Sequence, residues 1–579
     1  IYGGWSYMIS RGDKIKVDKA VKILTNAVIG LLIILSSFII TTFIINALTK
    51  RGQSQSIVQE RAKRYFEPLS GALGAGVIND HYPPRGAVEM PRNVNIFVTF
   101  KVPIDPATII DGYKEELGEN EEQSVNLKTS NIKIYKTADG AGDALASDQV
   151  RTYVSEDKQT FVFVPRSFLG SSVTDTNYTV SLGPGIRKTD GASAFVSGGR
   201  YESENGYEWI FEVSTDLDLE PPKVVSVIPK AGETEERNTI VAITFSEAMN
   251  PIMASGSYIP SEGKLFNIIR VNDNTVADSP AIVEGSFVIS NGYKTVDFVS
   301  TDKCGVDPCG NDIYCLPADA SLGVNAKAAK LDSPLEIPPN PQADLSAGMY
   351  NGLVDASGNS FNGNGNTTTR ESLLIAGYSN TSAVGETESD IDKIIQKVGT
   401  DTGFAEGEVV DGYDWSFATN NNINTTPPNI TGLSPTLFGE DVLEEQDVEI
   451  TFSGLLFPRT VNSDNIQIWP VPLYPFWFVN SLDGEIVSKI TIKHAAMISK
   501  EDGGHGYMPT ITQGVRSKNQ ICMVPAKGPG KIGKTLGECG VNDTSPNCCA
   551  EILGVDEATG GITTTKNQKA QVGPCSPPL

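Results

Sequence analysis

The feature that most constrains this chain is an uncharged apolar run near its beginning. Residues 23–49 read ILTNAVIGLLIILSSFIITTFIINALT and lie between Lys22 and the pair Lys50-Arg51. A helix of this length would be roughly 40 Å long, against a bilayer hydrocarbon core of about 30 Å. Ile and Leu occur all round such a helix, whereas a soluble helix keeps one polar face. The run therefore predicts a transmembrane helix that tethers the rest of the chain to a lipid bilayer.

The charge is unevenly distributed along the 579 residues. The net charge is -24, yet residues 1–64 carry ten Lys or Arg against three Asp or Glu. The remaining body is strongly acidic and would repel polyphosphates, so we expect no nucleic-acid partner. Basic residues flank the apolar run equally on both sides, so the positive-inside rule does not choose its orientation.

A short pattern around the apolar run resembles a known membrane module. Residues 2–48 contain a YGG turn, the charged loop SRGDKIKVDK and then the Gly-containing apolar run. This order resembles the two-helix pilin-like module of type IV secretion systems in uncultivated small-genome bacteria. The resemblance implies a first helix ending near Ile1, a cytoplasmic loop and an extracellular body after residue 50. It also implies that the module could form homo-oligomers.

The body contains a repeated strand pattern. Proline pairs at 83–84, 221–222 and 427–428 each precede an alternating segment that ends in Thr-Phe. Alternation with a period of two predicts half-buried strands. The residues expected on the core face are Val98 and Phe100, Ile243 and Phe245, and Ile450 and Phe452.

A second strand recurs in the first two units. The segments GYEWIFEVST at 206–215 and GYDWSFATN at 412–420 place Tyr, Trp and Phe two residues apart, on one side of a sheet. Further short strands are expected at 160–165 and 177–182, between turn residues, which favours β-sandwiches. The clearest helical segment of the body, 389–399, falls in an insertion expected over 323–402.

These repeats resemble the bacterial Ig-like domains of S-layer proteins, and the second unit carries the features most fully: the ITFSEAMNP run, the D-x-x-G-N turn at Asp355 and the W-x-F strand. The resemblance implies a mainly β fold, with serial Ig-like β-sandwich domains behind an N-terminal transmembrane helix. The third unit lacks a W-x-F strand, so it is either truncated or divergent. The expected divisions are a membrane module at 1–51, a connector at 52–80, Ig-like domains at 81–216 and 217–420, and an Ig-like or divergent Cys-rich β domain at 421–579.

The eight cysteines favour disulfides in an oxidising compartment. No C-x2-C pair occurs and the chain has only three histidines, which argues against a zinc site. Two of the three cysteines in CGVDPCGNDIYC could pair locally and leave one over, but connectivity stays open. The candidates are Cys304, Cys309, Cys315, Cys522, Cys539, Cys548, Cys549 and Cys575.

Two segments could supply oxygen ligands to calcium. One is DASGNSFNGNGN, which offers Asp355, Asn359, Asn362 and Asn364 but departs from the EF-hand loop, so a plain turn is the alternative. The other is the acidic linker that contains Asp216, Asp218 and Glu220, for which simple solvation is the alternative. We expect no other cofactor.

Motifs for catalysis are weak. GPGKIGKT at 528–535 fits the phosphate-loop expression, but Pro and Gly surround it where a strand and a helix are required. Neither G-x-S-x-G nor H-E-x-x-H occurs. The aromatic run WPVPLYPFWFV at 469–479 is either core or an exposed contact patch.

We therefore expect a membrane-anchored cell-surface protein, not an enzyme, with its C-terminal body outside the cell and a structural, adhesive or cell-contact role. Its partners would be the bilayer and an unidentified surface protein or glycan. The first alternative is a subunit of a type IV secretion or pilus-like apparatus. The second is a tethered hydrolase, which a polar cleft with converging carboxylates would favour.

Overall fold

A computed structural model describes most of the body of the chain. The described residues are 77–117, 122–195, 206–218, 220–275, 280–329, 343–344, 349–350, 352–363, 412–436, 442–462, 464–469, 476–483, 487–494, 508–523, 550–553 and 569–572. The predicted membrane helix and pilin-like module, the connector, the helix at 389–399 and the segment 528–535 lie outside them. Among the described helices, none has both the length and the apolar character needed to cross a membrane.

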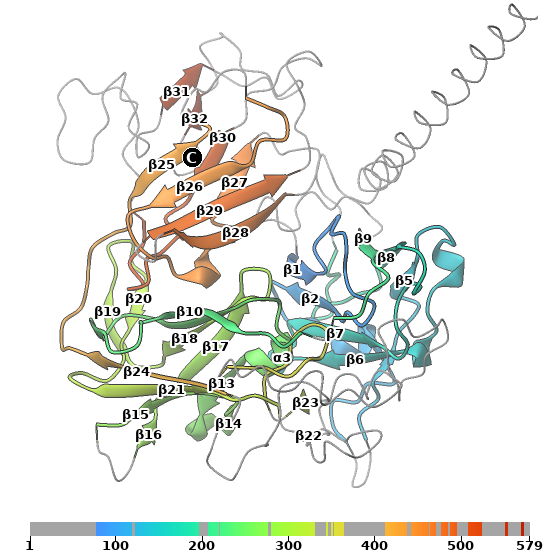
Figure 1. The fold of residues 1–579 in the computed structure, drawn as a ribbon, viewed down its shortest axis with the longest axis horizontal. Coiled ribbons are helices and arrows are strands. Elements are labelled where there is room, and N and C mark those ends of the chain that lie inside the picture. Colours follow the sequence, from blue (N-terminus) through green and yellow to red (C-terminus); the bar gives the residue numbers. More distant parts are fainter. Residues whose placement is uncertain are drawn as a thin grey trace, which may run out of the picture. The chain divides into compact units, whose positions relative to one another are not determined.

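The first domain is a sandwich of two antiparallel sheets (Figure 1). Its larger sheet has the order β1-β2-β7-β6-β4-β3 and its smaller sheet the order β5-β8-β9. The strands are β1 (Ile78–Tyr82), β2 (Ile96–Phe100), β3 (Ile110–Asp111), β4 (Asn126–Leu127), β5 (Ile132–Lys136), β6 (Val150–Val154), β7 (Thr160–Pro165), β8 (Thr176–Leu182) and β9 (Tyr207–Val213). Three short 3-10 helices join them: η1 (Pro106–Thr108), η2 (Ala141–Asp143) and η3 (Ser147–Gln149).

The second domain also has two main sheets, with orders β10-β12-β18-β17-β13-β14 and β11-β24-β21-β15-β16. The strands of the first are β10 (Val224–Ile228), β12 (Val241–Phe245), β13 (Gly256–Ile259), β14 (Lys264–Leu265), β17 (Gly285–Ser290) and β18 (Thr295–Ser300). Those of the second are β11 (Thr234–Glu235), β15 (Ile269–Asp273), β16 (Ala281–Ile282), β21 (Ser321–Ala326) and β24 (Tyr413–Thr419). The domain also contains α3 (Pro251–Ala254), η4 (Pro260–Glu262) and the pairs β19 (Lys303–Val306) with β20 (Asp312–Tyr314), and β22 (Ala343–Asp344) with β23 (Met349–Tyr350).

The third domain is built around the sheet β25-β26-β29-β28, with the pairs β27-β30 and β31-β32. Its strands are β25 (Ile430–Ser434), β26 (Val448–Phe452), β27 (Ile466–Trp469), β28 (Phe476–Asp483), β29 (Val487–His494), β30 (Met508–Ile511), β31 (Ala550–Leu553) and β32 (Lys569–Val572), with η6 (Pro458–Thr460). One hydrophobic core joins β25, β26 and β29 to β27 and β30. The described chain is thus mainly β, as predicted.

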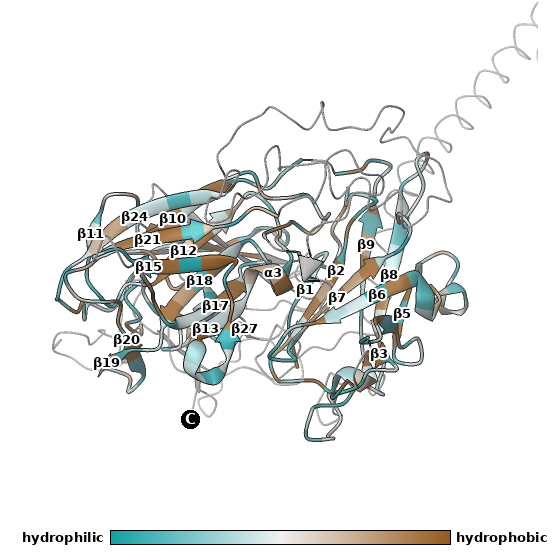
Figure 2. Cartoon of the chain, turned by 90° about the horizontal axis from the view of Figure 1, so that it is seen from below, coloured by the Kyte–Doolittle hydropathy of each residue, from teal (hydrophilic) through white to brown (hydrophobic). Residues whose placement is uncertain are grey.

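The aromatic strands occupy the predicted position in their sandwiches. Tyr207, Trp209 and Phe211 of β9 all belong to the first core, and Trp209 is fully buried. Trp415 and Phe417 of β24 belong to the second core, with Tyr413 packed against it. Figure 2 shows apolar residues gathered along strands such as β2 and β7, while the nearby loops are more polar.

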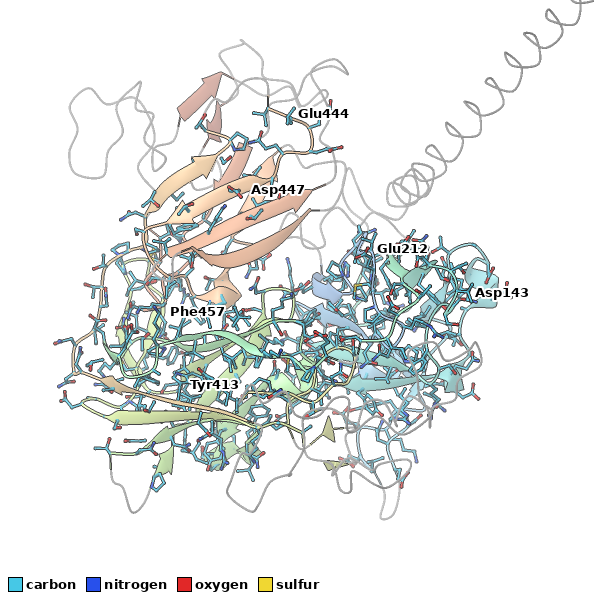
Figure 3. The ribbon with its side chains drawn as sticks, in the orientation of Figure 1. Asp143, Glu212, Tyr413, Glu444, Asp447 and Phe457 are labelled. Atoms are coloured by element: carbon cyan, nitrogen blue, oxygen red, sulfur yellow. A yellow bond between two sulfur atoms is a disulfide. The ribbon has the colours of Figure 1, made fainter. Side chains whose placement is uncertain are left out.

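The prediction of half-buried strands is wrong for β2 and β12, because each sheet is covered on both faces. Phe97, which precedes the predicted core residue Val98 and lies on the opposite face of β2, packs with Val162 of β7 into the core of the second domain. Its ring lies 5.3 Å from that of Tyr293, measured between centroids. Ala242 of β12 likewise packs against Phe457 of the third domain (labelled in Figure 3). Neighbouring domains therefore bury the faces that alternation would leave to solvent.

The predicted insertion begins too early. β21 pairs with β15 on one side and with β24 on the other, so residues 321–326 lie inside a main sheet. Leu353 and Phe361 are also fully buried in the second core. Both 321–329 and 352–363 therefore belong to the sandwich, which the prediction of an insertion over 323–402 missed.

Candidate cation site at the first domain junction

The linker after β9 lies between the first two domains. The backbone N–H of Arg92, in the first domain, donates to the carbonyl of Asp216 at 2.9 Å, and that of Asn95 donates to Ala356 of the second domain at 2.8 Å. The Asn93 side chain bonds the backbone of Asp218 and the carbonyl of Ser357. The linker is thus fixed to both domains.

The predicted D-x-x-G-N turn forms the second-domain side of this junction. Asp355 Oδ1 accepts from the backbone N–H groups of Ser357 and Asn359, at 2.7 and 2.8 Å. Gly358 has φ +84°, a left-handed conformation that glycine adopts without steric cost. These bonds hold the Asp355 carboxylate in place, with the residue only 1% exposed.

Three carboxylates converge at this junction. They belong to Asp218 in the linker, Glu247 in the loop that follows β12, and Asp355, and one oxygen from each lies within 4.8 Å of the others. They come from three segments far apart in the sequence. Like charges this close repel strongly unless a proton or a cation lies among them.

The electrostatics of the trio reflect this crowding. Burial, with the neighbouring Asp218 carboxylate, raises the pKa of Glu247 to about 8. Burial and the charge of Glu247 also raise the pKa of Asp355 well above its usual range. Burial is again the main cause of a raised pKa for Tyr82, in the first domain, and the three carboxylates add to it. The cation of Lys294 offsets part of the shift at Glu247.

A buried amide lies beside the trio. Asn359 Nδ2 donates to Asp355 Oδ2 at 2.9 Å and to the carbonyl oxygen of Asp218 at 3.2 Å. Asn359 is fully buried, yet its Oδ1 has no hydrogen-bond partner. A buried acceptor left in this way costs about 1 to 3 kcal/mol.

The two predicted calcium segments therefore meet, but with a changed ligand set. Asp355 and Asn359 lie together with Asp218, whereas Asp216 and Glu220 are exposed and outside the trio. The backbone N–H of Asn362 donates to Pro222 at 3.0 Å. Asn364 lies outside the described residues. Sequence reasoning missed Glu247; its place in the ITFSEAMNP run was the available signal.

A second cluster of Asp307, Cys309 and Cys522 is not a metal site, because its two sulfurs are bonded to each other in a disulfide. Cys304 pairs with Cys315 across the β19-β20 hairpin, and Cys309 pairs with Cys522 in the third domain. One local pair with one cysteine left over is the predicted pattern. The described chain has no free cysteine. The other candidates, Cys539, Cys548, Cys549 and Cys575, lie outside the described residues.

A cavity of about 770 Å³ lies elsewhere, where the second and third domains meet. It is lined by the β10 strand and by residues of 424–428, 453–455 and 517–519, and includes none of the three carboxylates. Converging carboxylates were the feature expected of a tethered hydrolase. Here they are held in a domain junction outside that cavity, and Asp355 is almost fully buried.

Comparison with known proteins gives no family. No family model matches the chain, and no curated protein matches it. Among solved structures, surface layer protein SbsC, domains 1–6, is 12% identical over 84% of this chain and 58% of that chain, with a TM-score of 0.15. The human desmocollin-1 ectodomain is 9% identical over 77% and 57%, with a TM-score of 0.12. This chain thus spans less than two thirds of either structure, and we base no argument on such low TM-scores.

Proposed function

We propose that this chain is a membrane-anchored protein of the cell surface whose Ig-like sandwiches form a structural or adhesive body without catalysis. The observation that carries the proposal is that three β domains are joined into one cross-linked body. Phe97 and Val162 join the first core to the second, and Cys309–Cys522 joins the second domain to the third. The apolar run at 23–49 would attach this body to the bilayer.

The disulfides support the outward placement of the body. Disulfides persist in oxidising compartments and are rare where cytosolic reductants act. Cys309 and Cys522 lie 213 residues apart in the sequence, and the folded second and third domains bring their Cα atoms to 6.3 Å. A body outside the cell would keep this bond oxidised.

The contacts between domains support a structural role. Arg459 of the third domain bonds the fully buried carboxylate of Asp297 in the second, and Lys518 bonds Glu235 at 2.6 Å. Gln520 accepts from the backbone N–H of Tyr314 at 3.0 Å and donates to the Tyr314 carbonyl at 2.6 Å. Such contacts favour a stiff body that presents a binding surface or an assembly contact in a fixed arrangement.

Protease treatment of intact cells that produce the full chain tests this proposal. We expect a protease added outside to release peptides from beyond residue 66, while a cytoplasmic control protein stays intact. Thiol titration of the denatured chain without reductant should leave the four described cysteines unreactive. A body that is protected until the cells are lysed, with reactive thiols, would overturn the topology.

The alternative role, as a subunit of a type IV secretion or pilus-like apparatus, is favoured by the sequence pattern at 2–48. It predicts homo-oligomers after extraction in a mild detergent, held together through the membrane module. A monomer would favour the adhesive role. Light scattering of the detergent-extracted chain distinguishes the two.

A further inference from the structure

We propose that Asp218, Glu247, Asp355 and Asn359 bind one calcium ion, which fastens the linker between the first two domains to the second domain. The site would take a hard divalent cation because all its ligands are oxygens. It goes beyond the proposed surface role and does not depend on which partner the body meets.

The ligand set follows from the contacts at the junction. The three carboxylates each offer an oxygen within 4.8 Å of the others, a spacing that one central ion can bridge with bonds of about 2.3 to 2.6 Å. Two of the three carboxylates are held before any ion arrives: two backbone N–H groups donate to Asp355 and one, from Glu220, donates to Asp218. A preformed site of this kind needs little ordering on binding.

Asn359 supplies the observation that points to a ligand. Its buried Oδ1 has no partner, while its Nδ2 lies between Asp355 Oδ2 and the carbonyl of Asp218. Turning the amide by half a rotation would place Oδ1 beside Asp355 Oδ2 and the carbonyl oxygen of Asp218. A calcium ion among these oxygens would coordinate them and so offset their mutual repulsion. The carbonyl of Asp218 would keep the hydrogen bond that it receives from Asn93. Carboxylates, amide and carbonyl then form a calcium shell, to which water can add.

The position of the site defines what the ion would do. Asp218 belongs to the linker, whereas Glu247, Asp355 and Asn359 belong to the second domain. Asn93 and Tyr82 bring the first domain to the same place. Calcium would therefore join the end of one domain to the start of the next, and its removal would loosen the junction without unfolding either sandwich.

Calorimetric titration of the full chain in detergent with calcium chloride tests the proposal. We expect Asp218→Asn and Glu247→Gln each to bind one calcium ion fewer than the wild type, or to bind it more than about tenfold more weakly, because affinity follows the charge of the ligands. Asp216→Asn is the matched control: it removes the same charge two residues away, at an exposed position, and should bind like the wild type.

Thermal unfolding separates binding from misfolding. At a hundredfold excess over Kd, calcium should raise the melting temperature of the wild type and of Asp216→Asn by about 5 °C over the value in EDTA. Asp218→Asn and Glu247→Gln should melt in EDTA no lower than the wild type, since each relieves repulsion, and should not respond to calcium. Equal calcium binding by the wild type and both variants, or no binding by the wild type, would overturn the proposal.

Magnesium chloride in place of calcium should give a smaller shift in the melting temperature of the wild type. An equal or larger shift would overturn the assignment to calcium.

Discussion

Asn93 and Asp218 pair as two residues of a β-ladder would, although one partner is a side chain. Asn93 Nδ2 donates to the carbonyl oxygen of Asp218 at 2.8 Å, and Asn93 Oδ1 accepts from the backbone N–H of Asp218 at 2.9 Å. Asn93 is only 6% exposed. A single side chain of the first domain thus satisfies both backbone groups of one linker residue.

Replacing Asn93 should weaken this junction. Asn93→Ala leaves the N–H of Asp218 without its partner, so we expect a loss of about 1 to 3 kcal/mol in the free energy of unfolding. Urea denaturation followed by tryptophan fluorescence measures it. Asn79→Ala, at an exposed position of β1, is the control and should change stability by less than about 0.5 kcal/mol. Equal effects of the two variants would contradict the role given to Asn93.

The two disulfides should differ in their contributions to stability. The bond Cys309–Cys522 closes a loop with a sequence separation of 213, against 11 for Cys304–Cys315. In the chain-entropy account the longer loop is worth about 5 kcal/mol and the shorter about 3. The paired serine variant of Cys309 and Cys522 should therefore lose more stability in guanidinium chloride than that of Cys304 and Cys315. The reverse order would contradict the account.

The buried contact between Arg459 and Asp297 gives a third prediction. Asp297 is fully buried on β18, and burial raises its pKa while the guanidinium of Arg459 opposes the rise. Arg459→Met should cost about 3 kcal/mol because a buried carboxylate loses its cation. Because the pKa of Asp297 is raised, its carboxyl group is protonated and neutral in acid and needs no cation there. The stability lost in Arg459→Met therefore grows as pH rises and shrinks as pH falls.

Chemical denaturation of Arg459→Met at pH 5 and pH 8 measures this trend. Adding Asp297→Asn to Arg459→Met should restore part of the stability, because the unpaired charge is then gone. Glu449→Gln, in the more exposed pair with Lys489, should cost less than about 1 kcal/mol. A loss of stability in Arg459→Met that is the same at both pH values would count against the buried charge as its cause.

His81 should make the first domain sensitive to acid. Burial, with the charge of Arg85, lowers the pKa of His81 from 6.5 to about 3. Its Nδ1 lies 2.9 Å from the carbonyl oxygen of Pro83 and its Nε2 2.9 Å from the Tyr207 hydroxyl. A lowered pKa stabilises the folded state above pH 6.5, and this contribution is lost as pH falls from 6.5 towards 3.

Stability should therefore fall by up to about 1.4 kcal/mol for each pH unit below 6.5, and by less where the ring is partly exposed. His81→Gln, which does not titrate, should flatten the curve between pH 6.5 and 4.5 in urea denaturation. The neighbouring Asp80 has the opposite sign, because burial raises its pKa to about 6 and its protonation in acid favours the fold. If the dependence of stability on pH is the same in His81→Gln as in the wild type, His81 is ruled out as the cause of the acid sensitivity.

Local patterns in the sequence predict the strands well. The alternation at 160–165 and 177–182 is found in β7 and β8, and the spacing of Tyr207, Trp209 and Phe211 places all three in one core. These features depend on the two-residue period of a strand, which a short window of sequence contains. The position of each strand in its sheet depends on partners far along the chain.

Contacts between domains could not be predicted in this way. Phe97 and Val162 read as apolar residues on the wrong face of a strand, because nothing nearby in the sequence says that a second domain covers them. Glu247 was passed over for a similar reason: it meets Asp218 and Asp355 only after three distant segments fold together. The partner of Cys309 was equally hidden, although a leftover cysteine was expected.

The bond between Cys309 and Cys522 also sets how tension would travel through the body. A pull on the two ends of the chain passes straight across the sulfurs, so the polypeptide between them carries none of the load. At about 3.4 Å per extended residue, the sequence separation of 213 residues corresponds to roughly 700 Å of extended chain. This length cannot be pulled out until the bond is reduced. The oxidation state of one pair of atoms would thus decide how far this protein can be stretched.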